Sequence, residues 1–328
     1  MYGVTVFTPT VNPLWKLERA YNSLLKQTHQ NLQWIVISDG STEDVRGFVE
    51  GLRAPFEVIL KENTTRQGKF ISYNRAIELA NRDFFCILDD DDELFPDSIE
   101  KLLNVWNDIP HKDRIKFWGV AGTSKLTSEL KNAISSSNFS YKSGSTYGYV
   151  DSNYDEMKFR FNTNDEKFSL TVLAIVKRFP YDPVTFHIPP STVWSVISRD
   201  YLMRYTDLVV RIYHHSPEGI MSSHRTYQVL LQRTLGIVIW TSDDLNYNIK
   251  YFKSAPRYFL KAAFNYARFK KHLRSSSHKI RCPANDKLRL ETQIADKIKI
   301  RNHLSLLLVI LVYPASLVWF FLDTKRGS

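Results

Sequence analysis

The feature that most constrains the fold is a run of five acidic residues placed directly after an apolar segment. Residues 84–88 read as a buried strand, and Asp89, Asp90, Asp91, Asp92 and Glu93 follow without a gap. Like charges this close repel each other, so the run is costly unless a cation lies beside it. Solvated acidic runs usually lie on helices or tails, whereas this one ends a strand, where α/β sheets bind ligands. We therefore predict a cation-binding functional site here.

The first 110 residues alternate strand-like and helix-like patterns joined by short connections. Strands are expected at 4–7, 34–37, 56–60 and 84–88, with helical spacing between them. This alternation is typical of a mostly parallel sheet flanked by helices. The predicted fold class is therefore α/β, with a Rossmann-like sheet.

Composition and charge narrow the function classes. With 43% hydrophobic and 24% charged residues, the chain is globular. Its two cysteines, Cys86 and Cys282, lie far apart, which argues against a disulfide framework and a four-ligand zinc site. Residues 1–249 carry a net charge of −3 and residues 250–301 a net charge of +12, so the basic excess is local. We expect no nucleic-acid partner, and a strand-like start at Val4 leaves no room for a cleavable signal segment.

An apolar segment follows the basic one. Leu304 to Leu322 contains 19 residues without a charge, close to the roughly 20 that a spanning helix needs. Flanking cations and aromatic residues favour a segment that associates with an anionic membrane surface. Two alternatives stay open, a buried terminal helix and a re-entrant hairpin bent at Pro314.

The acidic run has the chemistry of a divalent-metal site. Alternate residues of an extended segment point the same way, so Asp89 and Asp91 can share one ion while Asp90 faces elsewhere. Oxygen ligands suit Mg²⁺ or Mn²⁺.

Four segments in this order resemble the family 2 glycosyltransferases of GT-A fold, which move sugars from nucleotide diphosphates. They read VTVFTPT at 4–10, WIVISDGSTED at 34–44, RQGKFISYNRAIELA at 66–80 and FCILDDDDELFPDSI at 85–99. The resemblance implies a GT-A domain with a metal site formed by Asp89 and Asp91. It also implies that Thr8 and Pro9 border the base and ribose and that Asp39 accepts a hydrogen bond from the base.

Three of these assignments have alternatives or additions. Asp39 precedes Gly40 and also suits a turn. Lys69, at a helix start, either contacts phosphate or extends along the surface. Asp90 is included with these residues as a contact of the nucleotide sugar.

Residues 177–225 resemble a region of bacterial members of the family less tightly. Phe179-Pro180, Ile188-Pro189, Val193-Trp194 and Arg211-Ile212-Tyr213 match, but Pro190 stands where a glutamate is expected. That glutamate would be a general base, so the role is unassigned, with Asp182 and Glu218 as the nearest candidates by sequence. His214 and His215 are candidates for a metal ligand or phosphate contact, and His224 with Arg225 for a cationic lid; an ordinary structural role is the alternative for each.

These observations predict four parts. Residues 1–110 would bind the nucleotide sugar, 111–249 would form the acceptor side, 250–303 a basic helical arm and 304–322 a membrane-associated segment. The string Gln232-Arg233-Thr234 departs from the Gln-x-x-Arg-Trp motif of processive synthases, which favours transfer of a single sugar.

The expected reaction is inverting, metal-dependent transfer from a nucleotide sugar to a lipid-linked saccharide. UDP is favoured as the nucleotide by its frequency in the family, and the cytoplasmic face of the inner or plasma membrane is the expected location. Two rivals stay open. A nucleotidyltransferase is disfavoured because residues 9–13 replace the Gly-rich basic loop of that class, and a non-catalytic, membrane-bound scaffold is conceivable because of Pro190.

Overall fold

The protein is described by a computed structural model that covers residues 1–11, 13–126, 142–143, 147–163, 166–182, 189–214, 227–275 and 296–327. The chain divides into two compact units. The first comprises Met1–Asp182 with Ser195–Gly219, and the second comprises Pro183–Trp194 with Ile220–Ser328. The four-part boundaries at 110, 249 and 303 stay predictions.

A ten-stranded mixed sheet organises the described part of the first unit, in the order β3-β2-β1-β4-β9-β6-β10-β8-β7, with β5 paired to β10. Its neighbouring strands β3, β2, β1 and β4 are parallel, and β9 is the antiparallel strand that joins β4 to β6. The strands are β1 Val4–Thr10, β2 Leu32–Asp39, β3 Glu57–Asn63, β4 Phe84–Ile87, β5 Glu93–Leu94, β6 Phe117–Leu126, β7 Lys142–Ser143, β8 Gly148–Ser152, β9 Lys167–Val172 and β10 Leu202–Tyr213. The predicted α/β class is confirmed.

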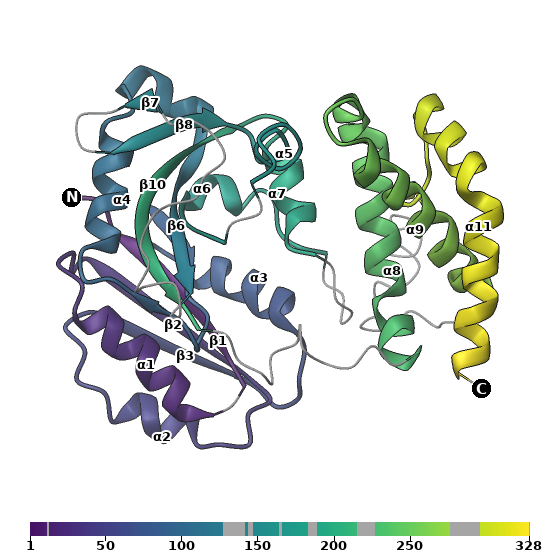
Figure 1. Cartoon of the computed structure of the whole chain (residues 1–328). Coiled ribbons are helices and arrows are strands. Elements are labelled where there is room, and N and C mark those ends of the chain that lie inside the picture. The colour runs from purple at the N-terminus through teal and green to yellow at the C-terminus, as the bar shows by residue number, and fades with distance from the viewer. Residues whose placement is uncertain are drawn as a thin grey trace. The chain divides into compact units, whose positions relative to one another are not determined.

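The helices of the first unit connect and flank these strands, whereas α8, α9 and α11 belong to the second unit (Figure 1). They are α1 Leu14–Leu25, α2 Val45–Glu50, α3 Lys69–Leu79, α4 Ser98–Asn107, α5 Tyr154–Phe159, α6 Leu173–Val176, α7 Ser191–Ile197, α8 Tyr227–Asp243, α9 Pro256–Ser275 and α11 His303–Gly327.

Alternating side chains give the parallel strands two apolar faces. One belongs to a core with α1 and α4, in which Tyr21 of α1 stacks on Trp34 of β2 with ring centroids 5.6 Å apart. On the other face, Tyr73 of α3 meets Phe7 and Phe85 edge to face, at 6.4 and 5.5 Å. Burial on both sides explains why these strands read as continuous apolar runs.

Parallel register brings the carboxyl ends of β1, β2 and β4 to one edge. Val4 of β1 lies opposite Leu32 of β2 and Phe84 of β4, so the strands begin level and run in the same direction. Residues following Thr10, Asp39 and Ile87 therefore gather at a single edge, where open α/β sheets bind ligands.

The described helices of the second unit pack side by side, with α9 against both α8 and α11 (Figure 1). Helix α11 continues through Pro314, so the re-entrant hairpin does not form. Within the described residues it is the one helix long and apolar enough to cross a membrane, with a mean hydropathy of 2.3 over its most apolar window and 22% of that window buried. The alternative of a buried terminal helix does not fit that exposure.

Candidate active site

The acidic run forms a turn between β4 and β5. The amide of Asp92 donates to the carbonyl of Asp89 at 3.1 Å, which closes the turn. Thr10 at the end of β1 donates through Oγ1 to Oδ2 of Asp90 at 2.7 Å. The turn is thereby attached to the neighbouring strand, and we call residues 89–92 the acidic loop.

Three cationic side chains from different elements meet carboxylates of this loop, and a fourth, Arg19 of α1, donates to the backbone carbonyl of Asp91 at 3.0 Å. Lys69, the first residue of α3, places Nζ 2.6 and 2.9 Å from the two carboxylate oxygens of Asp89. Lys16 of α1 lies 3.9 Å from Asp91, and Arg211 of β10 lies 3.2 Å from Asp92. These contacts partly offset the repulsion that makes the acidic run costly.

The compensation is uneven. Burial, opposed in part by Arg211, raises the pKa of Asp92 to about 7, and burial together with Asp91 and Asp89 raises the pKa of Asp90 to about 6. Asp89 differs because burial is outweighed by Lys69 and Arg211, which hold its pKa below the usual range. Ionisation of these two carboxyl groups is therefore opposed by their surroundings, which is the condition expected where a further cation belongs.

Strand β10 supports the loop from the other side. Arg211 is buried and donates from Nε to Ser124 of β6 at 2.8 Å, which orients its guanidinium toward Asp92. Next to it, Nε2 of His214 lies 2.7 Å from the Glu93 carboxylate, and its backbone amide donates to Asp92 at 3.3 Å. The ring of His214, a predicted candidate for metal or phosphate, thus meets Glu93.

Lys16, Thr10 and Arg211 were given no role at this loop by the sequence analysis. Arg211 and Thr10 lie within matched segments, the Arg-Ile-Tyr string and VTVFTPT, but nothing in the local sequence marks Lys16. Their contacts with the loop depend on the pairing of distant strands and helices.

Asp39 holds the loop that precedes α3. Its buried carboxylate accepts hydrogen bonds from the side chain of Asn63 and the amides of Gln67 and Gly68, at 2.8, 2.8 and 2.7 Å. Gly40 follows with φ of 73°, and a Cβ there would lie 2.7 Å from the Arg66 amide nitrogen. The carboxylate thus positions the start of α3, and its predicted contact with a base would share oxygens already used by the chain.

The two residues predicted to border the base and ribose lie at the carboxyl end of β1. Thr8 is buried, and its hydroxyl oxygen accepts from the Trp34 indole at 2.9 Å. Pro9 is half-buried and pairs in register with Ile37 of β2. Both therefore lie one or two residues before Thr10, the strand's contact with the acidic loop.

The donor set fits a hard divalent cation. It consists of carboxylate oxygens, two of them on groups whose pKa is raised, and oxygen ligands are those that Mg²⁺ and Mn²⁺ prefer. Within the described ranges no three His, Cys, Asp or Glu side chains are grouped so that they could hold one ion. Ligation of one ion by Asp89 and Asp91 therefore stays a prediction.

Of the two candidate bases, Asp182 lies within the described residues. The preceding residue, Tyr181, exchanges two backbone hydrogen bonds with the Asn74 side chain of α3, at 2.8 and 2.9 Å, and its ring lies 4.5 Å from that of Phe70. Asp182, half-buried, is thereby placed beside the helix that begins at Lys69. Pro190 precedes α7, whereas Glu218, His215, His224 and Arg225 lie outside the described residues.

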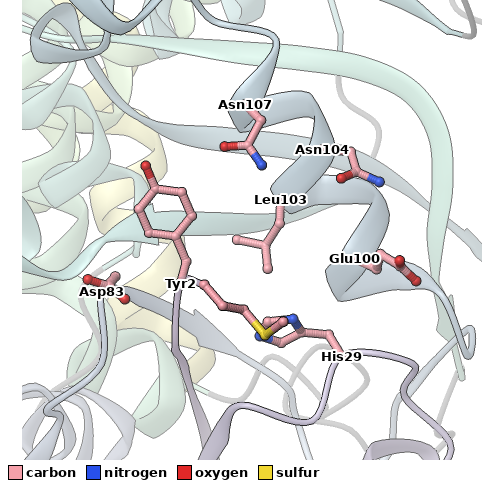
Figure 2. Close-up of a pocket in the computed structure, with 8 residues that line it drawn as sticks. Tyr2, His29, Asp83, Glu100, Leu103, Asn104 and Asn107 are labelled. Carbon is pink, nitrogen blue, oxygen red and sulfur yellow. The ribbon is translucent and has the colours of Figure 1, made fainter.

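A separate hollow of about 610 Å³ lies at the opposite, amino-terminal edge of the sheet (Figure 2). Two of its polar groups serve the fold, because Asp83 accepts from the Gly3 amide at 2.7 Å and Glu100 from Thr28 at 2.5 Å. The lining residues are Met1, Tyr2, His29, Asp83, Glu100, Leu103, Asn104 and Asn107. It is distinct from the acidic loop.

Comparison with curated proteins identifies bacterial relatives. A GalNAc(5)-diNAcBac-PP-undecaprenol beta-1,3-glucosyltransferase of Campylobacter jejuni is 27% identical over 87% of this chain and 91% of its own length. An uncharacterized glycosyltransferase of Rickettsia prowazekii is 28% identical over 35% of this chain, and only 36% of that relative is spanned.

Solved structures share the fold at low identity. S. aureus TarS 1-349 in complex with UDP-GlcNAc superimposes with a TM-score of 0.56 at 15% identity, over 99% of this chain and 89% of that one. A mannosyltransferase from Pyrobaculum calidifontis in complex with GDP-Man and Mn²⁺ gives 0.53 at 14% identity, over 99% and 87%. At 14–15% sequence identity, these structures show that the fold is shared.

The family comparison covers the region that contains the acidic loop. Residues 5–159 match the family described as Glycosyl transferase family 2, and this range includes β1, Asp39, Lys69 and residues 89–92. Together with the shared fold, this match confirms the resemblance seen in the sequence. Residues 5–159 therefore match the family 2 glycosyltransferases, and the chain has a GT-A fold.

Proposed function

We propose that this enzyme transfers one sugar from a nucleotide diphospho-sugar, with UDP the favoured nucleotide, to a saccharide carried on a membrane lipid. The observation that carries the proposal is the acidic loop at the carboxyl edge of the sheet, with two carboxyl groups of raised pKa beside Lys69 and the start of α3. Cationic groups and a helix amino terminus at this edge suit a diphosphate.

The acceptor class is supported by the Campylobacter jejuni relative, which is matched over 91% of its length and whose name specifies a lipid-linked saccharide. The exposed apolar helix α11 supports a membrane-held substrate as well. We place the reaction at the cytoplasmic face of the membrane, in cell-surface polysaccharide synthesis.

Each group of the site would have a defined part in the reaction. Asp89 and Asp91 would hold Mg²⁺ or Mn²⁺, which when bound supplies Lewis-acid stabilisation to the departing diphosphate. Lys69 would release Asp89 and pair with phosphate, because an ammonium and a metal ion compete for the same carboxylate. Arg211 would keep Asp92 oriented, and Asp39 would keep Lys69 at the site by fixing the preceding loop.

Inverting transfer needs a base on the face of the sugar opposite the leaving group. We propose Asp182 for this role, since the Tyr181 backbone is attached to α3 by Asn74. An Asp182→Asn variant should bind donor normally and lose most of its transfer. Normal transfer would return Asp182 to an ordinary loop role.

The test uses the purified full-length enzyme, a panel of nucleotide sugars and polyprenyl diphosphate-linked oligosaccharides. We expect the acceptor to gain the mass of a single sugar, whose anomeric configuration is inverted relative to the nucleotide sugar. EDTA should abolish this transfer and Mn²⁺ should restore it. Donor binding without any product would instead favour the scaffold, and addition of several sugars would contradict single transfer.

A further inference from the structure

Helix α11 has two unlike sides. Five residues face its neighbours and are no more than 7% exposed: Ser305, Leu308, Ser316, Phe320 and Asp323. Ten large apolar residues on the remaining surface are 41–70% exposed: Leu304, Leu306, Leu307, Ile310, Leu311, Tyr313, Val318, Trp319, Phe321 and Leu322. We call this second set the apolar face of α11; so large a continuous apolar surface marks a site of interaction.

The opposite side is attached to the unit near both ends of the helix. In the first turn, the Ser305 hydroxyl donates to the carbonyl of Leu245, just after α8. Toward the other end, Asp323 lies 2.7 Å from Arg268 Nε and 3.0 Å from His272 Nε2, both on α9. The helix is therefore fixed against α8 and α9 over most of its length.

This attachment decides between crossing a bilayer and lying on it. If α11 crossed, the attached α9 would enter the hydrocarbon at similar depth, carrying exposed Lys261 and Arg274 together with Lys270 and Lys271. Such charges are expensive inside a bilayer, and α9 is not among the described helices apolar enough to cross. The pair of α11 and α9, apolar on one side and basic on the other, instead fits the interfacial plane.

Charge identifies the surface that this face would meet. Lys299 and Arg301 are exposed immediately before α11, where Arg301 also pairs with exposed Asp296. Asn246 holds both backbones, with bonds of 2.9 Å to the Lys299 carbonyl and 2.7 Å from the Arg301 amide. Exposed Lys250 and Lys253 follow Asn246 in the chain. Cations beside the first turn of an apolar face complement anionic lipid headgroups.

We propose that α11 lies in the plane of a single leaflet of an anionic membrane, with its apolar face in the acyl-chain boundary, and does not cross the bilayer. This inference deepens the proposed function and rests on its membrane-held acceptor. It predicts that both ends of α11 stay on the side of the membrane where α9 lies.

Thiol labelling of full-length protein in the membranes of bacterial expression cells tests the inference. In a Cys282→Ser background, where Cys86 is buried, single cysteines are placed before the helix by Lys299→Cys and after it by Ser328→Cys. A membrane-impermeant maleimide should label both in inside-out vesicles and neither in intact spheroplasts. Labelling of Ser328→Cys in spheroplasts, or its protection in inside-out vesicles until detergent is added, would overturn the proposal.

A matched pair of variants tests the apolar face itself. Ile310 and Leu311 are 60% and 70% exposed, so Ile310→Glu with Leu311→Glu should leave the fold intact, as circular dichroism can verify, and release most of the protein from vesicles containing phosphatidylglycerol. The control, Lys112→Glu with Ile115→Glu in the first unit, where Ile115 is 80% exposed, should stay bound. Retention of the α11 variant, or recovery of unaltered full-length protein in the soluble fraction, would overturn the proposal.

These measurements require no sugar transfer. An inactive enzyme with both cysteines labelled from the same side would support the in-plane helix and contradict only the proposed reaction.

Discussion

Asp323 and the aspartates of the acidic loop differ in how their negative charge is matched by basic side chains. Asp323 of α11 is 5% exposed and meets Arg268 and His272 at 2.7 and 3.0 Å. The four aspartates of the acidic loop instead share Lys16, Lys69 and Arg211 among their described partners, and burial raises the pKa values of Asp90 and Asp92 to about 6 and 7.

This difference distinguishes a structural carboxylate from a functional one. A single buried carboxylate with two basic partners is fully compensated within the protein, so its replacement should lower stability. Carboxylates whose pKa values are raised because too few cations lie beside them can accept a further cation. Replacing one of them should weaken ligand binding.

The largest expected effect is on the acidic loop. Asp91→Asn should lower turnover by roughly 100-fold or more, because a metal ligand is lost, while thermal stability is unchanged or slightly higher since repulsion is relieved. Calorimetry of Mn²⁺-dependent nucleotide binding measures the loss. The control Asp97→Asn, in an exposed pair with Lys101 at 2.8 Å, should behave as unmodified enzyme, and unchanged binding in Asp91→Asn would remove the metal assignment.

The next effect concerns the matched carboxylate. Asp323→Leu should lower the free energy of unfolding by about 3 kcal/mol, because the largely buried Arg268 loses its counter-charge and buried His272 loses its hydrogen-bond partner. Donor binding should be retained, since the acidic loop belongs to the first unit. Chemical denaturation measures the stability, and calorimetry measures binding of the nucleotide sugar. Loss of that binding without loss of stability would contradict the structural role of Asp323.

A smaller effect is expected at Asp39. Asp39→Ala leaves three donors without their acceptor and should cost about 2 kcal/mol of stability, because each buried donor without a partner is costly. Affinity for the nucleotide sugar should fall as the start of α3 moves, while Mn²⁺ affinity measured without nucleotide should be unchanged. Equal loss of both affinities would mean that the whole edge of the sheet depends on this loop.

A further effect is a dependence of stability on pH in metal-free protein. The pKa values of Asp90 and Asp92 are raised above the unfolded value of 3.8, so the folded state binds more protons between the unfolded and folded pKa values. Stability from these groups should therefore fall as pH rises from about 5 toward 7, by about 3 kcal/mol. Asp92→Asn should flatten the profile in thermal denaturation with EDTA, and an equally steep profile would contradict the raised pKa.

The sequence predicted the parallel half of the sheet well because strand and helix patterns there are local. The apolar runs that contain Trp34 and Phe84 each form a strand, and the acids after Phe84 fall at the expected edge. The four matching segments also led to the correct family and fold.

The partners of the acidic loop could not be predicted in the same way. Thr10 meets Asp90 across 80 residues and Arg211 meets Asp92 across 119, so these contacts exist only once the sheet has formed. The same applies to Asp39, whose three hydrogen bonds come from a loop more than 20 residues away. Burial of Asp323 could not be predicted either, because a charged residue directly after an apolar segment is usually an exposed flanking residue.

The most direct test of the central claim, that the acidic loop binds a metal and a nucleotide, is anomalous diffraction from crystals of the full-length enzyme grown with Mn²⁺ and UDP. We expect an anomalous peak between the carboxylates of Asp89 and Asp91, with Lys69 displaced from Asp89 toward the diphosphate. A nucleotide bound at this edge without the peak, or with Lys69 still paired to Asp89, would contradict the account.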